Sequence, residues 1–177
     1  MSRRSTFECM FVPQSVAAIG ATDRESSVGR TLLANLLNGL YQGKVFAVNP
    51  KRHEVLGLHC YKNIGSIPEK IDLAVIVTPA PTVPAVVGEC VEAEVRAAIV
   101  ISAGFREMGE AGAKLEMEIQ EQLSRGTMRL IGPNCLGIMN PLAGLNATFA
   151  HDIARPGNVA FLSQSGALET AILDWSI

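Results

Sequence analysis

The stretch SVAAIGATDRESSVGRTLLANLLNGLYQGKVFAVNPKR, residues 15–52, decides the fold of this chain. It opens with an apolar run of strand length at 15–20 and continues through a polar turn. Apolar residues at 32, 33, 36, 37 and 40 then share one face of a helix predicted over 28–40. A second apolar run at 44–49 ends at Pro50. This order predicts a strand, a crossover helix and a second strand parallel to the first.

The same alternation continues through most of the chain. Apolar runs at 71–77, 97–101 and 128–131 predict three further strands, with helical patterns at 83–95 and 111–125 between them. The runs are continuous rather than alternating, which is typical of a parallel sheet covered on both faces. We therefore predict a Rossmann-like, doubly wound α/β domain over residues 1–155. Such sheets bind ligands at the carboxyl ends of their strands.

The last residues indicate the beginning of a second unit. An apolar run at 159–162 predicts another strand, and residues 167–175 predict a helix whose apolar face carries Leu168, Ile172 and Trp175. That face needs a surface to pack on. We expect residues 156–177 to form the first strand and helix of a second, flavodoxin-like domain that this chain does not complete.

The composition of the chain argues against several classes of protein and of binding site. The 177 residues carry a net charge of −2, which gives no electrostatic basis for nucleic acid binding. No apolar run approaches the roughly 18 residues of a membrane span, and no signal peptide is apparent. The four cysteines form no CxxC pair and the three histidines have no metal-ligand spacing. We expect a cytoplasmic protein with no metal site, no nucleic acid partner and no membrane partner.

The turn at 20–30 is the first candidate site. Gly20 permits a tight turn, Gly29 lets the following helix approach the sheet, and Ser26 or Ser27 can cap that helix. The backbone N–H groups of such a turn can receive a phosphate. The turn is not GxGxxG, and an ordinary strand-to-helix turn with a capping serine is the alternative.

The end of the second strand bears on the ligand. Dinucleotide-binding domains usually place an acid there to hold a ribose 2′-hydroxyl. This chain has Lys51 and Arg52 instead, which disfavours NAD and favours a ligand with an additional phosphate. Coenzyme A and NADP both meet that description, and two solvated surface cations are the alternative.

Three later strand ends supply further candidates. Pro79 lies in a proline-fixed turn, Ser102 and Ala103 leave room for a ligand beside the fourth strand, and Asn134 lies in a rigid exposed loop. Cys135 has no histidine near it in sequence to activate it, so we interpret it as a packing or site-lining residue.

A second anion site is predicted at 163–166, where Ser163, Ser165 and Gly166 lie between a predicted strand and a helix. A doubled helix cap is the alternative.

The motifs GPNCLG at 132–137 and PGNVAFLSQSG at 156–166 resemble the nucleoside-diphosphate-forming acyl-CoA synthetases, which include the succinyl-CoA synthetase α subunit and the ADP-forming acetyl-CoA synthetases. The resemblance extends to GATD at 20–23 and VNPK at 48–51. It implies a coenzyme A-binding domain at the front of a longer protein. The residues that it places at coenzyme A, together with those that the strand ends suggest, are Gly20, Thr22, Ser27, Val28, Lys51, Pro79, Ile101, Ser102, Ala103 and Asn134.

The resemblance also implies a reaction. In the complete protein, an acid, coenzyme A and ATP would give acyl-CoA, ADP and phosphate, with a phosphate held by Ser163, Ser165 and Gly166. The family's phosphoryl-carrying histidine lies past Ile177, and the domain that binds ATP and Mg²⁺ is absent. We therefore assign no catalytic residue and expect this chain alone to bind coenzyme A without turnover. The missing domains or a β subunit would be its partners, in an oligomer.

One alternative stays open within this resemblance. The segments GLNATF at 144–149 and ILDW at 172–175 are similar to those of large bacterial protein lysine acetyltransferases, in which an inactive synthetase region would sense coenzyme A or acetyl-CoA. Acetate-specific synthetases carry similar segments.

Overall fold

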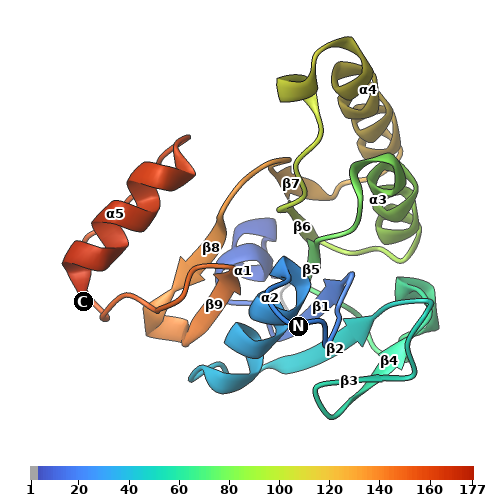
Figure 1. Cartoon of the computed structure of the whole chain (residues 1–177). Helices are drawn as coiled ribbons and strands as arrows, with labels where there is room; N and C mark the ends of the chain where they lie inside the picture. Colours follow the sequence, from blue (N-terminus) through green and yellow to red (C-terminus); the bar gives the residue numbers. More distant parts are fainter. Residues whose placement is uncertain (1–3) are drawn as a thin grey trace.

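The computed structural model describes residues 4–177. Its centre is a seven-stranded sheet in the order β3-β4-β2-β1-β5-β6-β7, in which all neighbours are parallel except β3 and β4 (Figure 1). The predicted parallel α/β sheet is confirmed. The strands are β1 (Ser15–Ile19), β2 (Lys44–Val48), β3 (Glu54–Val55), β4 (Leu58–Tyr61), β5 (Leu73–Ile76), β6 (Ala97–Val100) and β7 (Arg129–Ile131).

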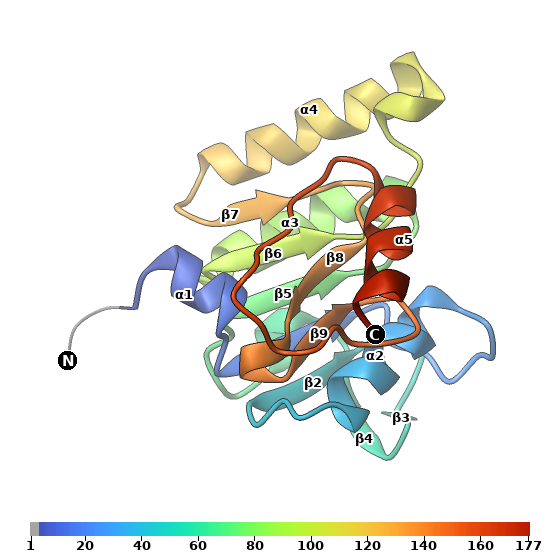
Figure 2. The same cartoon turned by 90° about the vertical axis from the view of Figure 1, so that its left-hand side faces the viewer.

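Helices and a small hairpin cover both faces of this sheet. Helices α3 (Val83–Glu92) and α4 (Glu110–Ser124) lie on one face (Figures 1 and 2). Helices α1 (Thr6–Phe11) and α2 (Val28–Asn38) lie on the other, with the hairpin of β8 (Gly137–Asn140) and β9 (Leu145–Thr148). Short 3₁₀ turns are η1 (Ile64–Ser66), η2 (Ala80–Thr82), η3 (Arg106–Met108) and η4 (Pro141–Ala143). None of the helices in residues 4–177 is both long and apolar enough to cross a membrane.

The central strand β1 explains why its sequence is an unbroken apolar run. Val16 and Ala18 pack in the core beneath α2, whereas Ala17 and Ile19 pack in the core beneath α3. Every residue of β1 is buried because both faces are covered. The chain leaves β1 toward β2 and later returns on the other side of β1 to form β5. The switch point of the sheet therefore lies between β1 and β5.

One predicted strand does not form. Residues 159–162 connect the hairpin to helix α5 (Gly166–Ser176) and pair with no strand in the described part of the chain. Val159 is 88% exposed and Leu162 is 92% exposed. An apolar run becomes a strand only where a neighbour satisfies its backbone groups, and no described strand lies beside this one. The predicted helix does form, with Leu173 buried and Trp175 89% exposed.

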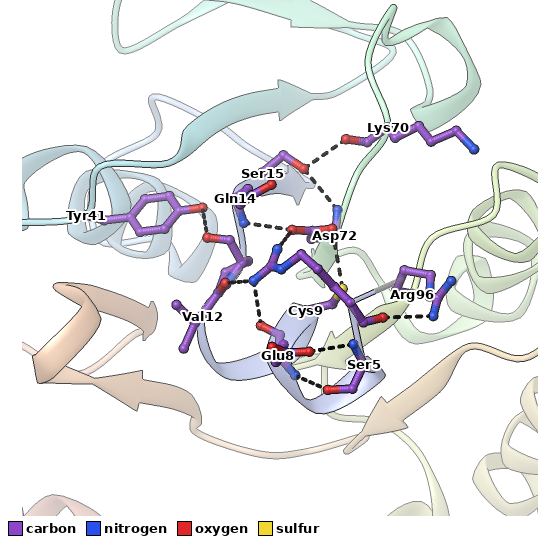
Figure 3. Close-up of polar contacts among 12 residues, drawn as sticks. Ser5, Glu8, Cys9, Val12, Gln14, Ser15, Tyr41, Lys70, Asp72 and Arg96 are labelled. Atoms are coloured by element: carbon purple, nitrogen blue, oxygen red, sulfur yellow. Dashed lines mark hydrogen bonds and ion pairs between the residues drawn. The ribbon is translucent and has the colours of Figure 1, made fainter. Parts of the chain in front are cut away.

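Helix α1 is held at the opposite edge of the sheet from the strands' carboxyl ends by contacts to Asp72 (Figure 3). The Arg4 guanidinium forms an ion pair with the Asp72 carboxylate, and both side chains are mostly buried. Asp72 also accepts a hydrogen bond from the backbone N–H of Gln14 at 2.8 Å and one from the Cys9 thiol at 3.4 Å. Arg96 donates to the Arg4 carbonyl at 3.2 Å. This network joins the start of the chain to the edges of β1, β5 and β6.

Candidate ligand-binding site

The parallel strands bring the loops after β1, β2, β5, β6 and β7 to one edge of the sheet. In Figure 2 this edge lies on the right, where the strand arrows end and where α5 begins. The sequence predicted ligand contacts in each of these loops, and the sheet brings all of them to the same edge.

The loop after β1 is packed tightly against α2. Gly20 has φ +97° and donates its N–H to the Val48 carbonyl at 2.9 Å. A Cβ on Gly29 would lie 2.5 Å from the Gly20 carbonyl oxygen, so only glycine allows this approach of helix to loop. Ser27, rather than Ser26, caps α2 by accepting a hydrogen bond from the Arg30 N–H at 3.3 Å. The first turn of α2 thus directs its free N–H groups toward the site edge.

Asn49 fixes the loop after β2. Its side-chain amide donates to the Ala21 carbonyl at 2.8 Å, and its side-chain oxygen accepts from the Lys51 N–H at 2.9 Å. Its own N–H donates to the Tyr61 carbonyl at 2.8 Å. One residue therefore connects the loops after β1 and β2 to strand β4.

Charged side chains gather at the corner of the site where the loops after β1 and β2 meet. Arg52 pairs with Asp23 of the first loop at 3.1 Å between nitrogen and oxygen. Lys51 is exposed and has no acidic partner among residues 4–177. The corner therefore carries two cations, Lys51 and Arg24 of the first loop, that no described acid neutralises, which suits an anionic ligand group.

A hydrogen bond and a close backbone approach join the loops after β5 and β6. The Ser102 hydroxyl donates to the Thr78 carbonyl at 2.6 Å. A Cβ on Gly104, which has φ +111°, would lie 2.9 Å from the Ala80 side chain. Pro79 and Ala103 are exposed, whereas the Ile101 side chain is 6% exposed and belongs to the core. Only the backbone of Ile101 is therefore available to a ligand.

The loop after β7 completes the edge. The Asn134 N–H donates to the Ser102 carbonyl at 2.9 Å, and Asn134 is exposed with φ +54°. The Cys135 thiol is directed at the Val100 carbonyl at 3.3 Å, and burial raises its pKa to about 11. A protonated, hydrogen-bonded thiol is a poor nucleophile, in agreement with the interpretation of Cys135 as a packing or site-lining residue.

The second predicted anion site lies beside this last loop. Ser165 caps α5 by accepting from the Leu168 N–H at 3.3 Å, and Ser163 accepts from the Ser165 N–H at 2.9 Å. A Cβ on Gly166 would lie 4.0 Å from the Leu136 side chain. The structure thus places Ser163, Ser165 and Gly166 at the β7 end of the same edge.

Sequence reasoning missed two residues of this edge, Asn49 and Thr78. Asn49 precedes a proline at a strand end, where an Asn side chain commonly bonds the backbone two residues on, and that signal could have identified it. Thr78 stands out only through its burial, which the sequence does not reveal. In residues 4–177 no group of three or more His, Cys, Asp or Glu side chains could hold a metal ion.

Comparison with known proteins identifies the family of this chain. The sequence profile described as "CoA binding domain" matches residues 14–141. The chain is 50% identical over 169 residues to acetate–CoA ligase [ADP-forming] I of Archaeoglobus fulgidus, covering 96% of this chain and 24% of the relative. It is 46% identical over 164 residues to acetate–CoA ligase [ADP-forming] II subunit alpha of Pyrococcus furiosus, covering 92% of this chain and 35% of the relative.

A solved structure agrees with these relatives. It is the dinucleotide-forming acetyl-coenzyme A synthetase 1 of Ca. Korarchaeum cryptofilum in complex with phosphate and ADP. That chain is 40% identical and superimposes with a TM-score of 0.89, over 96% of this chain and 36% of the other. The present chain spans well under half the length of each of these proteins.

Proposed function

Because this chain belongs to the family of coenzyme A-binding domains, we propose that it binds coenzyme A along the carboxyl edge of its sheet as part of an ADP-forming acyl-CoA synthetase. The observation that carries the ligand assignment is Lys51. It lies in the loop that follows β2, in the region where dinucleotide-binding domains place an acid to hold the ribose of NAD, and no described acid neutralises it. It suits the 3′-phosphate of coenzyme A.

The order of the loops suggests how the ligand lies. The cations Arg24, Lys51 and Arg52 are all in the loops after β1 and β2, together with the acids Asp23 and Glu25. The pyrophosphate would lie at the N-terminus of α2, near Thr22, Ser27 and Val28, where free N–H groups and the helix dipole favour negative charge. The neutral pantetheine arm would then cross the ends of β5 and β6, past Pro79 and Ser102, with its thiol toward Asn134 and α5.

In this orientation the coenzyme A thiol would lie near the N-terminus of α5, where we expect a phosphate or phosphoryl group to bind. We assign Ser163, Ser165 and Gly166 to a phosphate or phosphoryl group, because capping hydroxyls and N–H groups at a helix N-terminus receive anions. The site lies beside Leu136, after the strand where the thiol would end. In the complete protein, the thiol would attack an acyl phosphate, releasing phosphate and forming acyl-CoA. The acyl phosphate would come from the acid and ATP, through groups beyond this chain.

The remaining assignments extend the same proposal. We assign the acetate-type reaction because the two relatives reported above are acetate–CoA ligases, and this favours a synthetase over a protein acetyltransferase. ATP, ADP and Mg²⁺ would bind to other domains or to a β subunit, in a cytoplasmic oligomer. Residues 156–177 would belong to the next domain, because α5 exposes an apolar surface that includes Leu168 and Trp175.

Calorimetry on the purified chain tests the proposal. Coenzyme A should bind, and NADH should bind far more weakly. Tighter binding of NADH would overturn the ligand assignment. Incubation with ATP, acetate and coenzyme A should yield no acetyl-CoA, whereas turnover by the chain alone would place an active site within these residues.

A further inference from the structure

The side-chain hydroxyl of Thr78 forms no hydrogen bond within the described part of the protein. Among residues 4–177, its Oγ1 is the single buried side-chain nitrogen or oxygen with no hydrogen-bond partner. Buried polar atoms in folded proteins are almost always paired, because an unpaired one loses its water without compensation. An exception at a strand end therefore needs an explanation.

The position of Thr78 suggests that explanation. It directly follows Val77, whose N–H bonds the end of β1, so it stands at the switch point between β1 and β5. Ligands bind at this point in open parallel sheets. The exposed fraction of Thr78 as a residue is intermediate although its hydroxyl oxygen is buried. The hydroxyl is thus turned inward, and rotation about the Cα–Cβ bond exchanges it with the methyl group.

Several polar groups of the same loops have hydrogen-bond partners of their own. The Ser102 hydroxyl donates to the Thr78 carbonyl at 2.6 Å, and the Thr82 hydroxyl donates to the Pro79 carbonyl at 2.7 Å. The Ile76 carbonyl accepts the Ile101 N–H at 3.0 Å. None of these groups bonds the Thr78 hydroxyl, which leaves it available to a group of a ligand.

The distribution of charged side chains around Thr78 indicates which kind of ligand group suits its hydroxyl. The residues next to Thr78 and Ser102, at 77–81 and 101–105, include no lysine or arginine. The nearest following cation, Arg106, pairs with Glu116 on α4. Phosphates prefer cations and helix N-termini, which lie in the loops after β1 and β2. A neutral hydroxyl beside small apolar residues suits amide and hydroxyl groups instead.

We propose that the Thr78 hydroxyl hydrogen-bonds the pantetheine arm of coenzyme A, and that ligand binding supplies the partner that the free protein lacks. This inference rests on the coenzyme A site proposed above and adds a residue that contacts the neutral part of the ligand.

The test measures affinity and thermal stability of the chain for three ligands: coenzyme A, dephospho-coenzyme A and adenosine 3′,5′-bisphosphate, which lacks the arm. Thr78→Val removes the hydroxyl and keeps the shape. Affinity for coenzyme A and for dephospho-coenzyme A should fall about 3- to 10-fold, the value of one hydrogen bond. Affinity for adenosine 3′,5′-bisphosphate should not change. The Tm of the free protein should stay equal or rise, because an unpaired buried hydroxyl has been removed.

Two variants serve as controls. Thr78→Ser keeps the hydroxyl and should bind coenzyme A like the wild type. Thr82→Val removes a hydroxyl from the same segment that does have a partner, so it should lower the Tm and leave affinity unchanged. Thr78→Ala compared with Thr78→Ser repeats the affinity test with a smaller side chain.

Three results would overturn the inference: unchanged affinity of Thr78→Val for coenzyme A, an equal loss for adenosine 3′,5′-bisphosphate, or a lower Tm showing that the hydroxyl has a structural partner. A wild-type chain that fails to bind coenzyme A would instead refute the proposed function.

Discussion

The carbonyl oxygen of Gly20 lies 2.5 Å from the position that a Cβ on Gly29 would occupy. This contact sets the distance between the loop after β1 and the first turn of α2, and it leaves no room for a methyl group. A side chain at position 29 would therefore push the loop and the helix N-terminus apart.

Gly29→Ala should damage both stability and binding. The added methyl group must displace α2 or the loop, and such overpacking costs about 1–3 kcal/mol. Because the N–H groups of α2 move with it, affinity for coenzyme A should fall as well. Urea unfolding and calorimetry measure the two effects. Gly65→Ala is the control, since its Cβ would meet its nearest neighbour at an ordinary 3.7 Å. Wild-type stability in Gly29→Ala would contradict the close contact.

Lys51→Ala should weaken the phosphate end of the site. A charge-assisted hydrogen bond is worth about 1.5–3 kcal/mol, so affinity for coenzyme A should fall roughly tenfold or more. The loss should be much smaller for dephospho-coenzyme A if the 3′-phosphate is the partner. Calorimetry with both ligands decides this. Lys114→Ala, on α4, controls for net charge. An unchanged affinity for coenzyme A would make Lys51 an ordinary surface cation.

Asp72→Asn should destabilise the fold and spare the site. It leaves the Arg4 guanidinium without its counter-charge in a mostly buried position, at a cost of about 1–3 kcal/mol. Helix α1 should loosen first. The ligand edge is at the other end of the strands, so affinity should be unchanged at a temperature where the variant is folded. Glu69→Gln breaks the exposed pair with Lys44 and should cost less than about 1 kcal/mol. Equal losses in the two variants would contradict the role given to Asp72.

The protein should lose stability at alkaline pH. Burial raises the pKa of the Cys90 thiol to about 12 and that of Cys135 to about 11, against an ordinary value of 9.0. A raised pKa in the folded state favours the protonated thiol there, so this contribution is complete below pH 9. It is lost as the pH rises toward 11 and 12, because the unfolded thiol ionises first.

Urea unfolding in reductant at pH 8, 9 and 10 measures this loss. Each thiol contributes a slope of at most about 1.4 kcal/mol per pH unit. Cys135→Ala should have a shallower decline than the wild type, whatever its stability at pH 8. An identical decline would show that Cys135 is not buried as described.

The sheet could be predicted from sequence because its signals are local. A buried parallel strand reads as an apolar run, and the run at 15–20 corresponds to β1 within one residue. The loops after the strands could be predicted as the site because parallel topology brings them to one edge.

The rest depends on contacts distant in sequence. Helix α1 is only six residues long and is held by Asp72, which lies 68 residues after its partner Arg4. Strand β9 is secured by Asn35 of α2, which donates to the Thr148 carbonyl at 3.0 Å. The run at 159–162 has the composition of a strand but lacks a neighbouring strand in the described chain. The strand predicted there from composition was therefore wrong. The unpaired hydroxyl of Thr78 likewise depends on what surrounds it.

The hydrogen bonds of Asn49 have a thermodynamic consequence. Because this side chain holds the loop after β1 and the loop after β2 together, a group that immobilises one loop also prepares the other. Linkage makes such an effect mutual: each half of a ligand that spans both loops binds more tightly when the other half is in place. We therefore expect the whole ligand to bind with a free energy that exceeds the sum measured for its separate fragments, and Asn49→Ala to reduce this difference to the part that covalent linkage of the fragments supplies.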